Sequence, residues 1–199
     1  MSKIRFTEPN REILARRDSI INDLTRLVDP AGLITSTDEC RAYETDALTA
    51  YRKMPLAVVL PKTTEEVSAV LKYCHDTGVK VVPRGAGTSL AGGAIPSEDA
   101  VVLGLSKMNR VLAVNYDDRF IRVEAGVTNL SVTAVVAENG FFYAPDPSSQ
   151  LACTIGGNIA NNSGGAHCLK YGVTTNTLLG VRMVLIDGSI IDLGGDYLD

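Results

Sequence analysis

The sequence predicts an α+β protein built from two successive lobes. Three observations carry this prediction: a strand–helix–strand pattern between residues 57 and 83, a change to short strands after Met108, and an uneven distribution of glycine. Every glycine except Gly32 lies at or after Gly78. We therefore expect an N-terminal helical segment (1–54), a small βαβ lobe (55–107) and an antiparallel α+β lobe (108–199).

Composition excludes several classes of protein. The 199 residues, 45% hydrophobic and 21% charged, are typical of a soluble globular chain. A net charge of -4 lacks the basic excess that nucleic-acid binding requires, so no nucleic-acid partner is expected. The longest uncharged stretch, 147–169, is too polar for a transmembrane segment, and residues 1–17 show no secretory signal. These features favour a cytoplasmic location.

The four cysteines are too scattered for a disulfide framework, a zinc site or an iron–sulfur cluster. They are Cys40, Cys74, Cys153 and Cys168, and none forms a C-x-x-C pair. We interpret them as reduced thiols in the core, and we expect no metal site.

Two helices are predicted in the N-terminal segment. From the N-cap Asn10, apolar residues follow helical spacing until Asp29-Pro30 stops the helix. A shorter helix begins near Ser36 or Thr37 and ends before Tyr43-Glu44-Thr45-Asp46, which we interpret as a surface turn outside the functional site.

The βαβ unit is marked by local chemistry. A strand at 57–60 precedes a capping box from Thr63 to Glu66, and the following helix ends at Gly78. Strands at 79–83 and 100–105 complete a small sheet with parallel or mixed pairing, and the crossover should be right-handed.

The second lobe is predicted from shorter elements. Strands at 110–114 and 120–124 precede a helix from Thr128 to about Asn139, capped by Gly140. The last strands, 178–186 and 189–193, should be joined by a two-residue turn at Asp187-Gly188.

Three polar or glycine-rich segments carry the functional signal. The first, P-R-G-A-G-T-S-L at 83–90, follows a strand and could turn several backbone N–H groups toward a phosphate. It fits neither G-x-G-x-x-G nor Walker A, because Leu90 replaces the third glycine and no lysine follows Gly92 or Gly93. The second is Y-A-P-D-P-S-S at 143–149, and the third runs from Cys153 to Gly172. We interpret all three as loops, where function concentrates.

Together these segments resemble the FAD-linked oxidases of the vanillyl-alcohol oxidase and p-cresol methylhydroxylase (PCMH) fold. The resemblance covers about residues 43–192 and is strongest to the branch that contains the FAD subunit of bacterial glycolate oxidase. It rests on P-R-G-A-G-T-S-L, on D-P-S-S-Q-L-A-C-T-I-G-G-N-I-A-N-N-S-G-G and on H-C-L-K-Y-G, in that order. It implies a PCMH-type FAD-binding domain of two α/β lobes with the cofactor between them.

The resemblance also implies which residues contact FAD. Those at the pyrophosphate are Arg84, Gly85, Ala86, Gly87, Thr88 and Ser89. Those that flank the flavin are Pro145, Asp146 and Ser148, and Val181 packs near it. Those that line its ring or ribityl chain are Thr154, Gly156, Gly157, Asn158, Asn161, Asn162, Gly164 and Gly165.

Other expectations follow from the same family. Relatives that bind FAD covalently use a His or Cys, which residues 84–90 lack, so we expect non-covalent FAD. Family members continue into another FAD-contacting strand and a substrate or cap domain. The resemblance therefore implies that the second lobe is incomplete, the cap domain absent and the isolated chain catalytically incomplete. His75 suits the C-terminus of its helix, whereas His167, Lys170 and Tyr171 could be either surface or site residues. No catalytic residue is assigned.

Three functions remain open from the sequence. The first is the FAD-binding part of an enzyme that oxidises a small 2-hydroxy acid of the glycolate or D-lactate type by hydride transfer to the flavin. Electrons would then pass to a second flavin subunit and an iron–sulfur subunit, through which the chain would associate with the membrane. The second is a non-catalytic FAD-binding or assembly module. The third is a nucleotide-sugar reductase of the same fold that acts on cell-wall precursors.

Overall fold

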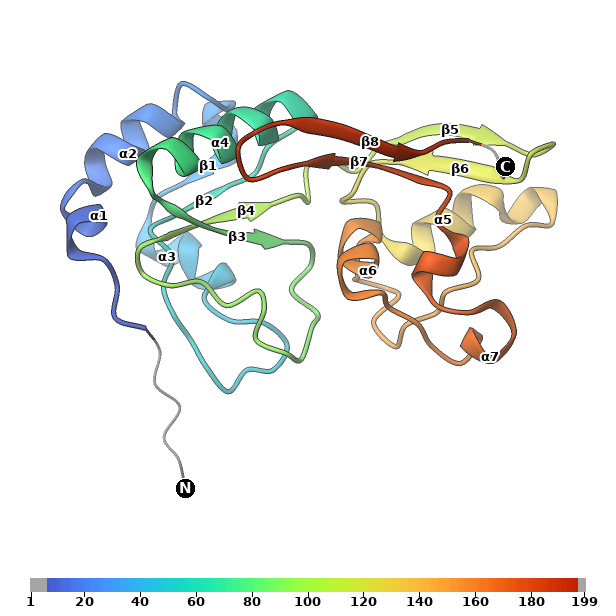
Figure 1. Ribbon diagram of the computed structural model, residues 1–199. Coiled ribbons are helices and arrows are strands. Elements are labelled where there is room, and N and C mark those ends of the chain that lie inside the picture. The colour runs from blue at the N-terminus through green and yellow to red at the C-terminus, as the bar shows by residue number, and fades with distance from the viewer. Residues whose placement is uncertain (1–6, 197–199) are drawn as a thin grey trace.

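The computed structural model describes residues 7–196, which form two lobes side by side. The first lobe contains β1 to β4 with α1 to α4, and the second contains β5, β6 and α5 to α7 (Figure 1). A C-terminal hairpin, β7 and β8, starts at the second lobe and extends along the top of the molecule to α4 of the first (Figure 1).

A four-stranded mixed sheet forms the centre of the first lobe. Its strands are β1 (Leu33–Ile34), β2 (Ala57–Val59), β3 (Lys80–Arg84) and β4 (Ala100–Gly104), in the order β1-β2-β4-β3. Both β2 and β3 run parallel to β4, whereas β1 is antiparallel to β2. Mixed pairing is thus confirmed, with β4 inserted between the two strands of the βαβ unit and the unexpected β1 at one edge.

Helices cover both faces of this sheet, which explains its continuous apolar runs. Every residue of β2 and β4 is buried. Neighbouring residues point to opposite faces, so Val59 and Val101 join the larger core while Val58 and Val102 join the smaller one. The larger core includes residues of α1 (Arg11–Ala15), α2 (Arg17–Leu24) and α4 (Thr64–Thr77). The smaller includes Cys40 of α3 (Thr37–Cys40).

The helix predicted from Asn10 to Asp29 is wrong in its extent. At Arg16 the backbone leaves the helical region (φ -95°, ψ 8°), and its N–H bonds to the carbonyl of Ile13, only three residues earlier. This break separates α1 from α2, which already ends at Leu24. Both helices still bury apolar side chains, because Ile13 and Ile20 lie in the same core.

The boundaries of α4 are confirmed, and local capping explains them. Thr63 Oγ1 accepts from the N–H of Glu66 at 3.2 Å, while the Glu66 carboxylate accepts from the N–H of Lys62 at 2.6 Å. At the other end Gly78 adopts a left-handed conformation with φ +72°, which glycine tolerates best.

The second lobe consists of short elements, as predicted, together with two helices that were not. Strands β5 (Val111–Asn115) and β6 (Phe120–Val123) form an antiparallel pair, followed by α5 (Asn129–Val136) and a 3-10 turn before Gly140. The segment interpreted as a glycine-rich loop contains α6 (Ile155–Asn161) and α7 (Cys168–Tyr171). That interpretation was wrong: α6 forms with Thr154 as its N-cap, although two glycines lie in its first turn.

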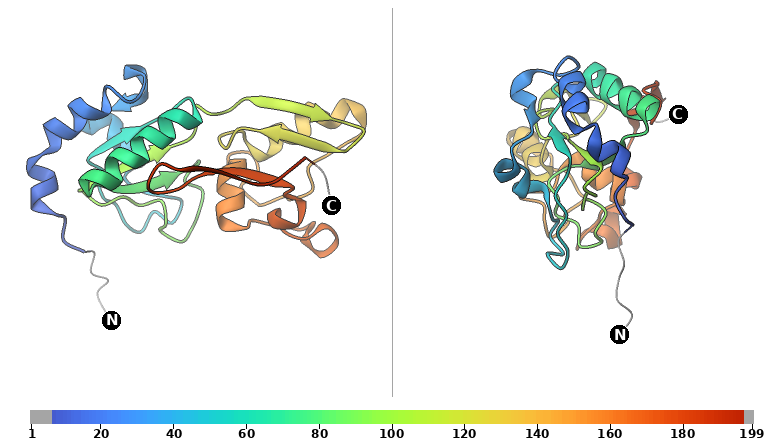
Figure 2. Two further views of the ribbon diagram at one scale, coloured as in Figure 1. Left: turned by 45° about the horizontal axis from the view of Figure 1, so that its top comes forward. Right: turned by 90° about the vertical axis from the view of Figure 1, so that its left-hand side faces the viewer.

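The hairpin of β7 (Gly180–Val184) and β8 (Ile190–Gly194) closes differently from the prediction. Gly188 N–H bonds to Leu185 O at 3.0 Å, so Ile186 and Asp187 are the central residues of the turn. Gly188 follows with φ +86°, the arrangement of a three-residue hairpin loop. The turn lies against α4, where Ser68 Oγ donates to Gly188 O at 2.5 Å. The hairpin thereby links the two lobes (Figure 2).

The four cysteines are free thiols, as expected. Cys40, Cys74 and Cys153 are buried, and burial raises the pKa of Cys74 to about 12. Cys168 is only half-buried, so the interpretation as core thiols holds for the first three.

Asp99, just before β4, joins the N-terminal helices to the sheet. Its carboxylate accepts from Lys80 Nζ at 2.8 Å, from Ser97 Oγ at 2.6 Å and from the N–H of Asn10 at 2.8 Å. Burial raises the pKa of Asp99, but these hydrogen bonds outweigh burial and hold it at about 2.

Replacing Asp99 with Asn should therefore destabilise the fold in a pH-dependent way. Because the folded-state pKa is below the ordinary value of 3.8 for aspartate, the charged form stabilises the fold above pH 4 and loses this effect as the pH falls toward 2. We expect Asp99→Asn to lower the free energy of unfolding by about 2 kcal/mol at pH 7 and by much less at pH 2. Urea denaturation across this range tests it, with exposed Asp38→Asn as control. An equal loss at both pH values would contradict the prediction.

Candidate functional site

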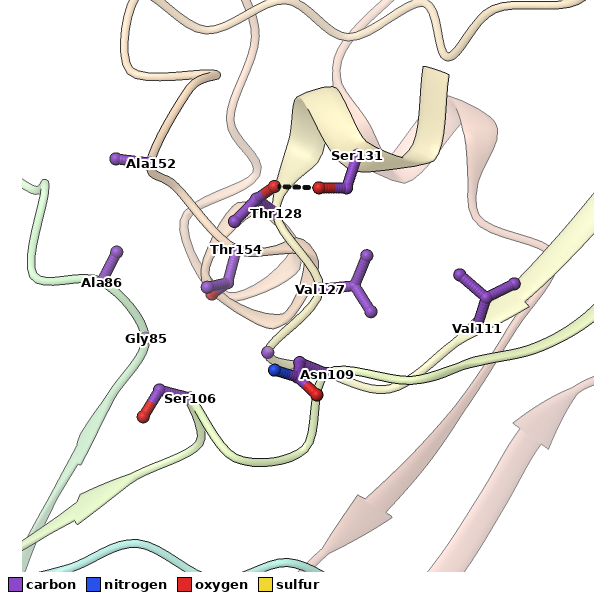
Figure 3. A pocket seen from close by; sticks show the side chains of 11 residues that line it. Gly85, Ala86, Ser106, Asn109, Val111, Val127, Thr128, Ser131, Ala152 and Thr154 are labelled. Atoms are coloured by element: carbon purple, nitrogen blue, oxygen red, sulfur yellow. Dashed lines mark hydrogen bonds between the residues drawn. The ribbon is translucent and has the colours of Figure 1, made fainter. Parts of the chain in front are cut away.

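The candidate site is a cavity of about 360 Å³ between the two lobes. Figure 3 shows Gly85 and Ala86 of the first lobe on one side, with Thr128 and Thr154 of the second lobe opposite. The lining residues are Gly85, Ala86, Ser106, Asn109, Val111, Gly126, Val127, Thr128, Ser131, Ala152 and Thr154. The cavity is therefore bounded by the loops that follow β3 and β4 and by the residues that begin α5 and α6.

Gly85 of the first lobe lies directly against Thr154 of the second. A Cβ on Gly85 would lie 2.5 Å from Thr154 Oγ1, so only glycine fits here without a shift. Thr154 is held in turn by a bridge to Thr128 and by its own capping bond, in which Oγ1 accepts from Gly157 N–H at 3.3 Å. The N–H of Ile155 bonds to Val127 O at 2.8 Å. These contacts fix the glycine-rich loop against the start of α6.

The loop after β3 presents a run of backbone donors. Among residues 7–196, the N–H groups of residues 86–90 make no hydrogen bond to a protein acceptor. Unpaired backbone N–H groups are costly unless water or a ligand accepts from them. Because Ala86 also lines the cavity, these N–H groups could receive a phosphate there.

One nitrogen of the Arg84 guanidinium is bonded within the protein, and Arg84 does not line the cavity. Nη1 donates to Thr45 O at 2.7 Å and to Ala94 O at 3.4 Å, and burial lowers the pKa of this half-buried side chain.

The interpretation of residues 43–46 as a surface turn was wrong, because Asp46 is buried and accepts from the N–H of Gly92 at 2.8 Å. Such a contact between distant segments left no local signal in the sequence.

The second and third segments meet around Asp146. Its Oδ1 accepts from the N–H of His167 at 3.0 Å, and its Oδ2 lies 3.4 Å from His167 Nδ1. A Cβ on Gly165 would overlap the carbonyl oxygen of Asp146. Pro145, whose carbonyl accepts from Asn129 Nδ2 at 2.9 Å, is buried nearby, whereas Ser148 is exposed. His167 thus lies beside a predicted site residue, with its side chain half-exposed.

Contacts within the protein account for much of the glycine and asparagine in α6 and after it. A Cβ on Gly156 would lie 2.8 Å from the Cβ of Ala125, and one on Gly164 would overlap Cys168 Sγ. Asn161 Nδ2 donates to Gly157 O at 3.0 Å, and Asn162 Oδ1 accepts from the N–H of Thr175 at 3.1 Å. These residues therefore have structural reasons for their identity in addition to the predicted cofactor contacts.

Asn158 differs from these neighbours because its side chain is not satisfied by the protein. It is 1% exposed, and its Nδ2 is buried with no hydrogen-bond partner among the described residues. A buried amide that lacks an acceptor costs stability unless a ligand supplies one.

The structure brings the predicted residues together in two groups. Gly85, Ala86 and Thr154 line the cavity, while the residues around Asp146 form the second group. Val181 lies in β7, opposite Leu193 of the hairpin. Sequence reasoning missed the cavity residues Ser106, Asn109, Val111, Gly126, Val127, Thr128, Ser131 and Ala152. The one local feature that could have indicated them is their place at the ends of elements, since several directly follow β4 or begin α5.

Comparison with known proteins shows which family the chain belongs to. The family described as FAD binding domain matches residues 55–194, which include β2 to β4 and α4 of the first lobe, the second lobe and the hairpin. The chain is a member of this FAD binding domain family. FAD is accordingly its cofactor, as the sequence predicted.

Two curated relatives extend this result. The chain is 47% identical over 183 residues to the glycolate oxidase subunit GlcD of Escherichia coli K12, which covers 92% of this chain and 37% of the relative. It is 39% identical over 178 residues to a D-lactate dehydrogenase of Archaeoglobus fulgidus. This match covers 89% of this chain and 39% of the relative. The chain therefore spans less than half the length of these relatives.

The fold is also shared with a solved structure. p-Cresol methylhydroxylase with substrate bound superimposes with a TM-score of 0.75 at 20% identity, covering 92% of this chain and 36% of that protein. The prediction of a PCMH-type FAD-binding fold with mixed α/β lobes is confirmed.

The residues present fit FAD. A dinucleotide offers phosphate oxygens that could accept from the free N–H groups of residues 86–90. The flavin ring offers carbonyl and ring-nitrogen acceptors, and Asn158 Nδ2 is a donor without a protein partner, although it does not itself line the cavity. The chain thus combines backbone donors and a buried amide donor, both without protein partners.

The close approach of Gly85 and Thr154 should be measurable as an energetic coupling. Gly85→Ala introduces a methyl group against Thr154 Oγ1, and we expect a loss of about 1–3 kcal/mol in the free energy of unfolding. Thr154→Ala removes the capping bond, for a loss of about 1 kcal/mol. The double variant should lose less than the sum, because the second change removes the obstructing oxygen. Denaturant titrations of all four proteins measure this coupling, and strict additivity would contradict the proposed contact.

Proposed function

We propose that this chain is the FAD-binding part of a flavoenzyme that oxidises a small 2-hydroxy acid. The observation that carries the proposal is the loop at 86–90, whose N–H groups have no partner in the protein and whose first residue, Ala86, lines the inter-lobe cavity. The proposed class of substrate is supported by 47% identity to a glycolate oxidase subunit and 39% identity to a D-lactate dehydrogenase.

In this proposal the chain binds and orients the cofactor. FAD, when bound, supplies the redox chemistry by accepting a hydride from the α-carbon of the substrate. Residues 86–90 hold the phosphates through backbone donors, and Asn158 donates one hydrogen bond from a buried position. We assign no residue of this chain as the base that takes the substrate proton.

The finer features of the proposal concern binding mode, substrate and partners. We propose that FAD is held without a covalent bond, because residues 84–90 contain neither His nor Cys. Glycolate or D-lactate is the proposed substrate, following the names of the two relatives. The word "subunit" in the name of GlcD supports a partner that receives the electrons, for which we propose a second flavin subunit and an iron–sulfur subunit.

Location is proposed on similar grounds. We propose a cytoplasmic chain that approaches the membrane through its partner subunits. No helix within residues 7–196 is both long enough and apolar enough to cross a bilayer.

FAD binding by the chain is the first test. We expect flavin to co-elute with the purified chain in gel filtration and to be released completely by acid precipitation. Gly87→Ala should raise the Kd for FAD by about tenfold or more, because Gly87 has φ +70° and its Cβ would overlap the Arg84 guanidinium. Gly93→Ala, which meets no atom within 4 Å, is the matched control. Failure of the wild-type chain to bind FAD would contradict the proposal.

Substrate class is tested in the flavoenzyme of which we propose that this chain is a part. Anaerobic addition of glycolate or D-lactate should bleach the oxidised flavin absorption. Bleaching by a nucleotide sugar with a reduced nicotinamide, and by no 2-hydroxy acid, would favour the reductase alternative. Flavin binding with no reduction by either substrate would favour a non-catalytic module.

Asn158 offers a test of the buried donor. Asn158→Leu keeps the approximate shape but removes the unpartnered Nδ2, so the cofactor-free chain should become more stable by about 1 kcal/mol. Its Kd for FAD should rise by about tenfold, because the donor is lost. Thermal unfolding and fluorescence titration measure the two effects, with Asn22→Leu, at an exposed asparagine of α2, as control. Lower stability together with unchanged FAD affinity would show that the amide has a protein partner.

A further inference from the structure

The glycine-rich loop after β3 is anchored to a segment almost forty residues earlier in the chain. Arg84 Nη1 donates to Thr45 O at 2.7 Å, Ala47 N–H donates to Gly87 O at 2.9 Å, and Gly92 N–H donates to Asp46 Oδ2 at 2.8 Å. Figure 1 shows both segments descending together below the sheet of the first lobe. The loop is thus held at its beginning, in its turn and near its end.

Arg84 occupies the inside of this turn. Its guanidinium carbon lies 5.5 Å from the centre of the Tyr43 ring, and the side chain is half-buried. The guanidinium occupies the place that a Cβ on Gly87 would take. Together with the left-handed backbone of Gly87 (φ +70°), this explains why residue 87 is a glycine. A planar guanidinium can stack on an aromatic ring while it donates to two carbonyls, whereas a lysine ammonium cannot reproduce that geometry.

Asp46 provides the second anchor. Its side chain is 4% exposed, with Oδ1 accepting from the N–H of Leu48 at 3.0 Å and Oδ2 from that of Gly92. The charge of Asp46 also favours the protonated guanidinium of Arg84 and so opposes the lowering of its pKa by burial. Both anchors hold the loop by its ends and leave the N–H groups of residues 86–90 unpaired between them.

We propose that Arg84 and Asp46 are positioning residues that hold the loop in its anion-receiving shape, and that Arg84 does not itself bind the phosphate. The inference rests on the proposed FAD binding. It refines the expectation that Arg84 supplies positive charge to the pyrophosphate. In this arrangement the backbone N–H groups receive the phosphate, while the arginine keeps them pointed toward it.

Hydrogen–deuterium exchange of the cofactor-free chain tests the proposal without FAD or substrate. We compare the wild type with Arg84→Lys, which keeps the charge, and Asp46→Asn, which keeps the shape. In both variants, exchange of the N–H groups of Ala47 and Gly92 should accelerate by about tenfold or more, because their anchors are weakened. Arg26→Lys, at an exposed arginine of the same lobe, is the matched control and should leave the exchange of both N–H groups unchanged. Exchange across β4 reports whether the fold is retained.

FAD titration gives the second readout. Arg84→Lys should raise the Kd for FAD about as much as Arg84→Gln, by about tenfold, because position rather than charge is lost. Loop exchange equal to wild type in both Arg84→Lys and Asp46→Asn would overturn the proposal, as would accelerated exchange that includes β4. Full FAD affinity in Arg84→Lys together with its loss in Arg84→Gln would show that the charge binds the phosphate directly. Failure of 2-hydroxy acids to reduce the flavin would refute the proposed function and leave the exchange result standing.

Discussion

The arrangement of the two lobes depends on the absence of a side chain at Gly85. Here the loop after β3 approaches Thr154 so closely that a methyl group would lie 2.5 Å from its hydroxyl oxygen. Thr154 also caps α6 and pairs with Thr128, so one contact links the sheet of the first lobe to two helices of the second. The inter-lobe cavity lies beside this contact and is lined by all three residues.

A second constraint explains why the backbone N–H groups of the glycine-rich loop have no partner in the protein. Its N–H groups remain unpaired because the loop is held by groups outside it, above all the Arg84 guanidinium and the Asp46 carboxylate. A loop that satisfied its own donors would have none left for phosphate. The hairpin turn that lies on α4 adds a further connection between the lobes, through Ser68 and Gly188.

Local chemistry predicted the elements of the first lobe well. The capping residues Thr63 and Gly78 mark the ends of α4, and the fully buried strands β2 and β4 were visible as continuous apolar runs. Prediction failed where local signals conflict. Two glycines in the first turn of α6 concealed a helix that Thr154 caps, and the backbone at Arg16 divided a helix whose apolar spacing is continuous.

The sequence by itself determined the order of most of the elements, the three segments of the proposed site and, through their resemblance to known flavoproteins, the family and its cofactor. These properties depend on residues close together along the chain, whose spacing can be read directly. Only the tertiary structure decided that Arg84 is engaged by Thr45, that Asp46 is buried and that Asn158 has an unpartnered amide. The physical reason is that hydrogen-bond partners and burial arise from segments distant in sequence, and local spacing carries no record of which segments meet.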